Sequence, residues 1–382
     1  MLSNKFHNSI FLILLITICG CNKNLTKENT CHLHLTDSTI NIGIASNINP
    51  TSRNIRYFKN QNIEYLAIQN DYKGISVYRL DSCLLVKNIT PQIEGPNGID
   101  SPIAGFDIVN FDTIFLLTDG IYDNIVIIDS ASQVIKKIKF NISYQPYFPL
   151  TNLWSSYGKC INYTNNEIII NSICLDTESA FDKSFNQNIA YCYNFILDSQ
   201  SVYPLKFPNN SKIRTQVKYS EASVIINKNN TILSYGLSHQ LFVSDNQTEW
   251  QEYDAKSRYI KKNLLPPNGT ELYETMKKFV ENPYYLALIY DKYRNVYYRF
   301  VYPGINVVRD DDIMKLSEFR RVFSIMVIDK DFNILGETLM PENTYNSNMF
   351  FINEAGLWIS ANHPDNPNFD EDTIRFQLFT LK

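Results

Sequence analysis

The sequence lacks a basic excess, a long hydrophobic run and a recognisable catalytic motif. Its 35 Lys and Arg residues are outnumbered by 39 Asp and Glu, which gives a formal net charge of −4. A chain without a cluster of basic charge lacks the electrostatic footprint of nucleic-acid-binding proteins. The sequence also contains no G-x-S-x-G, Walker, GxGxxG or HExxH pattern. We therefore expect no nucleic-acid partner and no cofactor, and the motifs give no positive evidence for an enzyme.

The longest apolar run, residues 10–18, is too short to cross a bilayer, which needs about 20 residues. It is typical of the hydrophobic part of a signal peptide. Gly20 followed by Cys21 resembles the lipobox of bacterial lipoproteins, which implies cleavage before Cys21 and acylation of its thiol. We expect a signal peptide over residues 1–20 and a lipidated tether over 21–30. The alternative is an ordinary secretory signal, with Cys21 a plain thiol.

The residue after Cys21 bears on the localisation. Asn22 lacks the acidic side chain that would suggest retention in the inner membrane. We expect an outer-membrane lipoprotein of the cell envelope that contacts the membrane through its N-terminal lipid. The sequence does not decide between the periplasmic and the surface side of that membrane.

Five cysteines remain after the predicted lipidation site: Cys31, Cys83, Cys160, Cys174 and Cys192. The number is odd and none of them form a CxxC pair, so the sequence supports neither a metal site nor a disulfide framework. Buried thiols that act as small hydrophobic side chains are the favoured interpretation. Cys174 and Cys192 fall on consecutive predicted strands, and whether they pair remains open.

Aromatic and β-branched residues are abundant, with 25 Tyr and 23 Phe, and favour strands over helices. Residues 106–140 show the repeating unit: four β-rich runs of about five residues, each closed by Asp, Asn, Gly or Ser. One such sheet cannot bury both of its faces, so copies of it must stack against each other.

The third strand of each copy ends in a turn that contains an aspartate, and this feature marks the repeats. The marked residues are Asp81, Asp129, Asp198, Asp245 and Asp329, and residues 374–382 have the same apolar pattern without the Asp. Six pairs of second and third strands predict an all-β fold, a six-bladed β-propeller of four-stranded antiparallel blades in one domain, residues 31–382. Seven blades are the alternative.

The last predicted sheet has no fourth strand after it, while residues 31–44 are β-patterned and have no blade of their own. We therefore expect the N-terminal strand to complete the C-terminal sheet and close the ring, which removes an open edge.

The sequence also predicts one short helical insertion, over residues 271–281, capped by Thr270. Leu272, Met276 and Phe279 or Val280 would form its apolar face. Opposite charges at 309–312 and 320–321 are expected to be solvated loops.

The densest polar and aromatic stretch, residues 284–303, predicts a hairpin with its turn at 291–295. Cross-strand aromatic pairs and turn chemistry alone explain its composition. The functional interpretation is a ligand-binding surface at one end of the ring, with aromatic faces and hydrogen-bonding side chains. The candidate residues are Tyr290, Asp291, Tyr293, Arg294 and Arg299. A glycan-cleaving propeller would need separated carboxylates that face the channel, and Asp107 and Glu221 are the candidates.

The lipobox, the six irregular repeats, the low glycine content and the stretch YDKYRNVYYR together resemble an uncharacterised family of Bacteroidetes lipoproteins with a six-bladed propeller-like domain. The resemblance implies a lipoprotein of the cell envelope with a six-bladed propeller fold. The family has no established activity, so the resemblance implies none for this chain. We expect a binding or scaffolding module for a glycan or an envelope protein. The alternatives are a hydrolase of carbohydrate or lactone substrates and a structural subunit of an outer-membrane assembly.

Overall fold

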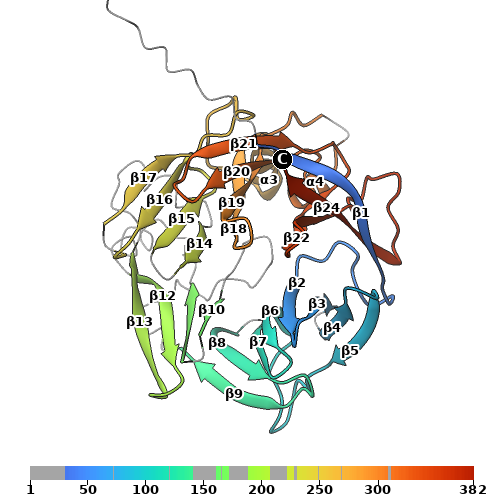
Figure 1. Cartoon of the computed structure of the whole chain (residues 1–382), viewed down its shortest axis with the longest axis vertical. Helices are drawn as coiled ribbons and strands as arrows, with labels where there is room; N and C mark the ends of the chain where they lie inside the picture. The colour runs from blue at the N-terminus through green and yellow to red at the C-terminus, as the bar shows by residue number, and fades with distance from the viewer. Residues whose placement is uncertain are drawn as a thin grey trace, which may run out of the picture.

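The computed structural model describes residues 31–71, 73–119, 121–140, 161–164, 166–171, 188–206, 222–227, 230–247, 249–267, 269–308 and 311–382. Its strands form six antiparallel sheets of four strands each, arranged as blades around a central axis (Figure 1). The predicted six-bladed β-propeller is therefore confirmed, and the seven-bladed alternative is wrong.

Each blade has four positions from the axis to the rim. The innermost strands are β2 (Ile55–Asn60), β6 (Ile103–Asn110), β10 (Ile161–Tyr163), β14 (Ala222–Ile226), β18 (Tyr284–Asp291) and β22 (Asn346–Ile352). The second strands are β3 (Ile63–Asn70), β7 (Thr113–Thr118), β11 (Glu167–Asn171), β15 (Thr231–Tyr235), β19 (Val296–Tyr302) and β23 (Leu357–Ser360). Their number agrees with the six pairs of second and third strands that the sequence predicts.

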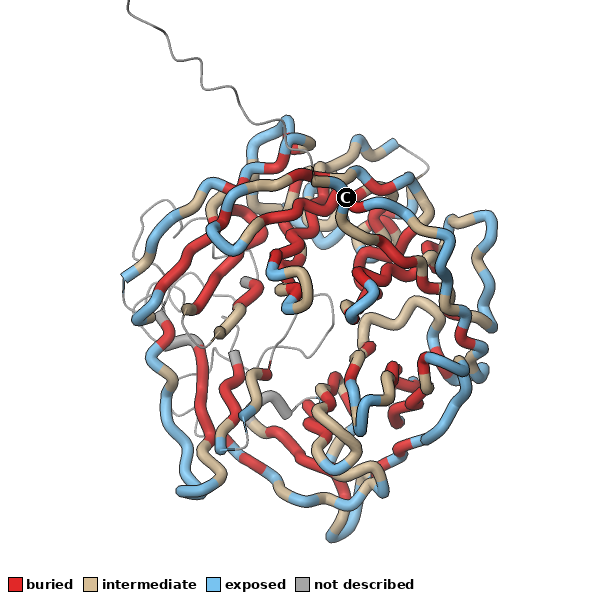
Figure 2. Tube along the Cα trace, in the orientation of Figure 1, coloured by how far each residue is buried: buried red, intermediate tan, exposed pale blue. Residues whose placement is uncertain are grey.

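The two outer positions also follow the prediction. The third strands are β4 (Gly74–Arg79), β8 (Ile121–Ile128), β12 (Asn188–Asn194), β16 (Gln240–Ser244), β20 (Ser324–Asp329) and β24 (Thr373–Leu381). The outermost strands are β5 (Leu84–Ile89), β9 (Val134–Lys139), β13 (Ser199–Lys206), β17 (Gln251–Asp254), β21 (Ile334–Leu339) and β1 (Leu33–Gly43). Burial falls toward this rim (Figure 2).

Two of the five marker aspartates, Asp129 and Asp329, stabilise the turn that follows the third strand of their blade. Asp129 Oδ1 accepts backbone N–H bonds from the residues two and four positions ahead, at 2.8 and 2.9 Å. Asp329 Oδ1 does the same at 2.9 and 2.8 Å. A short carboxylate that binds the N–H groups ahead of it stabilises the tight turn into the fourth strand.

The ring closes through both ends of the described chain. Strand β1 pairs antiparallel with β24, from Leu33 opposite Leu381 to Gly43 opposite Thr373. The last sheet therefore has the order β1-β24-β23-β22, as predicted. Six hydrophobic clusters fill the six spaces between neighbouring blades, including the space between the last blade and the first. Each blade thus buries both faces against its neighbours.

The described residues contain two helices, α3 (Leu272–Glu281) and α4 (Ile313–Glu318), and the second of these was not predicted. The N-cap residue of α3 is Glu271, not the predicted Thr270. The Thr270 hydroxyl donates instead to the Glu274 carboxylate at 3.0 Å. Leu272 is exposed and Val280 is buried, which narrows the predicted apolar face. Within the described part of the chain, neither helix has the length and apolar character needed to cross a bilayer.

Candidate functional site

A cavity of about 650 Å³ lies on the axis of the ring, and the innermost strands of all six blades contribute to its wall. Its lining includes four tyrosines (Tyr57, Tyr163, Tyr290 and Tyr293), two asparagines (Asn162 and Asn227) and four charged residues (Arg56, Lys59, Asp107 and Lys292). These ten side chains are half-buried or exposed, whereas lining residues such as Phe115 and Leu288 are buried between blades. The polar and tyrosine side chains thus form the accessible part of the cavity wall.

The predicted hairpin supplies one side of the cavity mouth. Strand β18 pairs with β19, with Tyr290 opposite Tyr297 and Asp291 opposite Val296. The turn reverses at Asn295, whose φ of 54° lies in the left-handed region that Asn tolerates. Tyr290 donates its hydroxyl to Asn295 Oδ1 at 2.8 Å. The hairpin and its turn are where the sequence predicts them.

The Asp291 carboxylate organises this turn from inside. Asp291 is completely buried and accepts backbone N–H bonds from Tyr293 at 3.0 Å and from Arg294 at 3.2 Å. Its other carboxylate oxygen accepts hydrogen bonds from Arg294 Nε at 2.5 Å and from the Tyr298 hydroxyl at 3.1 Å. A buried carboxylate with four donors is fully satisfied. Asp291 therefore holds the turn rather than contacting a ligand.

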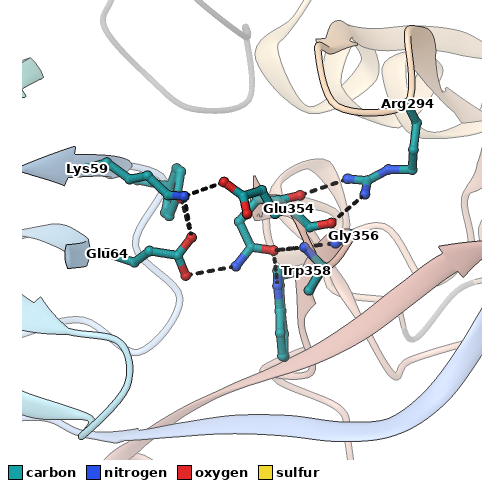
Figure 3. A network of polar contacts seen from close by, with 9 residues as sticks. Lys59, Glu64, Arg294, Glu354, Gly356 and Trp358 are labelled. Atoms are coloured by element: carbon teal, nitrogen blue, oxygen red, sulfur yellow. Dashed lines mark hydrogen bonds and ion pairs between the residues drawn. The ribbon is translucent and has the colours of Figure 1, made fainter. Parts of the chain in front are cut away.

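Arg294 ties the turn to the next blade (Figure 3). Its terminal nitrogens donate to the carbonyl oxygens of Asn353, at 2.8 Å, and Glu354, at 3.0 Å. Asn353 in turn donates to Glu64 of the first blade at 3.2 Å and accepts from Trp358 Nε1 at 2.9 Å. The Arg294 guanidinium, which we expected to be presented to a ligand, donates instead to backbone groups of the β22–β23 turn and to Asp291.

The first blade completes the mouth. Lys59 Nζ lies 2.6 Å from a Glu354 oxygen and 3.4 Å from a Glu64 oxygen, and the Tyr57 hydroxyl donates to Glu64 at 2.6 Å (Figure 3). Burial, the Glu64 carboxylate and the neighbouring Tyr293 raise the pKa of Tyr57 well above its usual range. Tyr57 therefore stays protonated and acts as a hydrogen-bond donor.

Arg299 does not lie at the end of the ring, so the prediction that it forms part of a ligand-binding surface there is wrong. Its side chain is completely buried, with the guanidinium stacked 3.5 Å from the Tyr285 ring centroid. Four backbone carbonyls and the Ser234 hydroxyl accept its hydrogen bonds, at 2.7–3.4 Å. Burial lowers the pKa of Arg299 to about 10, so it stays charged at neutral pH. It joins the fourth and fifth blades.

The environment of Arg320 also differs from the sequence-based prediction, which placed this residue in a solvated loop. It is 3% exposed, its guanidinium lies over the Phe279 ring at 4.4 Å, and it donates to the Phe279 carbonyl at 2.7 Å. A cation at the last turn of α3 complements the negative end of the helix dipole. Arg321 follows the prediction more closely, since it is part-exposed and pairs with Asp311.

Of the two carboxylates considered for glycan cleavage, Asp107 lines the cavity and lies 3.4 Å from Arg56 Nε. Glu221 falls outside the described residues, as do Cys21, Cys160, Cys174 and residues 309–310. Cys192 carries a free thiol that donates to Glu167 at 3.4 Å. Burial and then Glu167 raise its pKa to about 11, so it is an unreactive thiol. No group of His, Cys, Asp and Glu among the described residues is arranged to hold a metal ion.

Sequence reasoning missed much of the cavity wall. Tyr57, Lys59 and Tyr163 lie on or beside inner strands, which were the least clearly marked strands of the repeat. Their signal was positional: once the second strand of a blade is assigned, the strand before it is the one nearest the axis.

No curated protein matches the chain. Among solved structures, it is similar to a member of the DUF4221 family from Bacteroides vulgatus, at 24% identity and a TM-score of 0.82, covering 93% of this chain and 99% of that one. It matches a virginiamycin B lyase from Staphylococcus aureus at 11% identity and a TM-score of 0.41, covering 91% and 99%. The family model "Domain of unknown function (DUF4221)" matches residues 24–339. With most of its length matched by that model, this six-bladed β-propeller belongs to the DUF4221 family.

Proposed function

We propose that this propeller is a binding module whose ligand is a glycan that enters the axial cavity. The observation that carries the proposal is the set of four tyrosines and two asparagines that share one cavity of about 650 Å³. Sites of roughly 300–1,000 Å³ with aromatic walls and a few placed polar groups are typical of small-ligand binding.

The wall suits the chemistry of a sugar. A sugar ring has C–H faces that pack on aromatic rings, and hydroxyl groups that need both donors and acceptors. Tyr290 and Tyr293 contribute rings at the mouth. Asn162 and Asn227 line the wall farther around, where the Asn162 amide nitrogen is enclosed and the Asn227 amide nitrogen also donates to Asn230 Oδ1 at 3.1 Å. An amide supplies both a donor and an acceptor. The turn that carries the tyrosines is fixed by Asp291, so little ordering entropy is lost on binding.

The test is a glycan array with the purified protein, followed by calorimetry on the best glycan. We expect Tyr293→Ala to weaken binding at least tenfold, because it removes a ring from the mouth. Tyr273→Ala is the matched control, since Tyr273 is 58% exposed on α3 and does not line the cavity. If no glycan binds, or if Tyr293→Ala binds as tightly as the wild type, the proposal fails and a partner protein becomes the leading candidate.

We also propose that the module is held at the outer membrane by lipid on Cys21. The support is the sequence Gly20-Cys21 after a short apolar run. Multiple acyl chains on one residue would anchor the protein durably. Cys21→Ser is expected to move the protein from the membrane fraction to the soluble envelope fraction. A variant that stays in the membrane fraction and remains extractable only by detergent would contradict the lipid anchor.

A further inference from the structure

The cavity wall differs in charge from the molecule as a whole. The chain has a formal net charge of −4. Yet among the described residues that line the cavity, three are cationic (Arg56, Lys59 and Lys292) and one, Asp107, is a carboxylate. A partly enclosed wall with one dominant sign of charge concentrates the field inside the cavity. How much of this positive charge is available to a ligand depends on which of the three cations have carboxylate partners.

Two of the three cations already have carboxylate partners. Arg56 Nε lies 3.4 Å from Asp107 on the neighbouring blade. Lys59 lies between Glu354, at 2.6 Å, and Glu64, at 3.4 Å. These pairs neutralise most of the charge that Arg56 and Lys59 would offer to a ligand.

Lys292 differs from both. Its ammonium lies 5.0 Å from the centroid of the Tyr293 ring. It forms no direct ion pair among the described residues, although its charge, after that of Lys59, also lowers the pKa of the Glu354 carboxylate. It is exposed at the tip of the turn that Asp291 and Arg294 hold in place. An unpaired ammonium is thus presented beside an aromatic ring at the cavity mouth.

We infer that the ligand is an acidic glycan, whose carboxylate or sulfate group is received by Lys292 while the sugar ring packs on Tyr293. This inference rests on the proposed glycan-binding function and adds the charge of the ligand. A charge-assisted hydrogen bond to an unpaired ammonium is stronger than one between neutral groups. A neutral sugar offers Lys292 only hydroxyl oxygens, which lack the ion-pair attraction of a carboxylate or sulfate.

The experiment compares two pairs of oligosaccharides by calorimetry. Oligogalacturonate is paired with its methyl ester, which has the same ring without the charge, and a sulfated galactan oligosaccharide is paired with its desulfated form. We expect the charged member of at least one pair to bind about tenfold more tightly, and the pair that discriminates identifies carboxylate or sulfate as the anionic group. The preference should weaken as salt rises.

Lys292→Met removes the charge and keeps most of the side-chain length. We expect it to abolish the preference for the charged oligosaccharide, so that the dissociation constants of the charged and neutral partners become equal. Lys87→Met, on the outermost strand β5, is the control and should change neither affinity. Equal binding of charged and neutral forms, or a preference that survives Lys292→Met, overturns the inference and leaves glycan binding standing. Failure of all four oligosaccharides to bind overturns the acidic-glycan inference, and the glycan array decides separately whether the proposed function also fails.

Discussion

Replacing Arg299 by Met tests whether this residue holds two blades together or serves a ligand. Arg299 extends from β19 of the fifth blade into the fourth, where it bonds to the backbone after β15 and β17. The carbonyl oxygens of Ser238 and Ala255 lie outside the strands and accept from Arg299 at 2.7 and 3.0 Å. Met cannot donate to them, and both would be left buried without this partner.

The magnitude follows from these contacts. Each buried acceptor left unsatisfied costs about 1–3 kcal/mol, and loss of the stacked cation on Tyr285 costs about 2 kcal/mol. Relief from burying a charge, which the lowered pKa of Arg299 reflects, offsets part of that sum. We expect a net loss of about 3 kcal/mol in the free energy of unfolding.

Urea denaturation followed by fluorescence measures the loss as a shift of the midpoint at an unchanged m-value. Arg79→Met is the control, because Arg79 is part of an exposed ion pair with Asp81 on the rim and should matter by less than about 1 kcal/mol. The reasoning would be refuted if Arg299→Met kept the wild-type midpoint while ligand binding was lost. That result would make Arg299 a ligand residue.

Two further substitutions probe the backbone and the pH dependence. Gly304→Ala should lower the free energy of unfolding, measured by urea denaturation, by about 2 kcal/mol or more. The reason is that φ at Gly304 is +77° and a Cβ would lie 2.5 Å from the Glu281 carbonyl oxygen. A denaturation midpoint equal to that of the wild type would contradict this expectation. Burial lowers the pKa of the His363 imidazole below its unfolded value of about 6.5. The contribution of the neutral imidazole to the free energy of unfolding is therefore complete above this unfolded value and is lost as pH falls through the folded pKa. The loss is at most about 1.4 kcal/mol per pH unit. His363→Asn should flatten this acid limb in denaturation midpoints measured across pH, and an unchanged slope would show that other groups cause it.

The strands were predictable because their signal is local. Apolar and aromatic runs that end at an aspartate depend on side-chain alternation and turn chemistry over a few residues, and Asp129 and Asp329 make the predicted turn contacts. Ring closure was predictable by elimination, since β1 had no sheet of its own and the last sheet lacked a strand. Helix α4 was missed because its six residues are too short to show a helical period.

The site was predictable only in part, because burial and pairing depend on segments far apart in the sequence. Arg294 and Arg299 lie five residues apart in one polar stretch, yet Arg294 reaches the sixth blade and Arg299 is buried against the fourth. Composition cannot distinguish these two roles, since both arginines have the same chemistry.

The sequence by itself determined the number of blades, the closing strand and the hairpin at the cavity mouth, because each depends on a pattern that recurs along the chain. The tertiary structure alone decided which side chains share the axial cavity, since the six inner strands meet only when the ring is closed. It also decided which cations are neutralised by neighbours. Lys59 lies within ion-pair distance of carboxylates from two blades, whereas Lys292 forms no direct ion pair among the described residues. Only the assembled ring brings the charges of different blades within that distance.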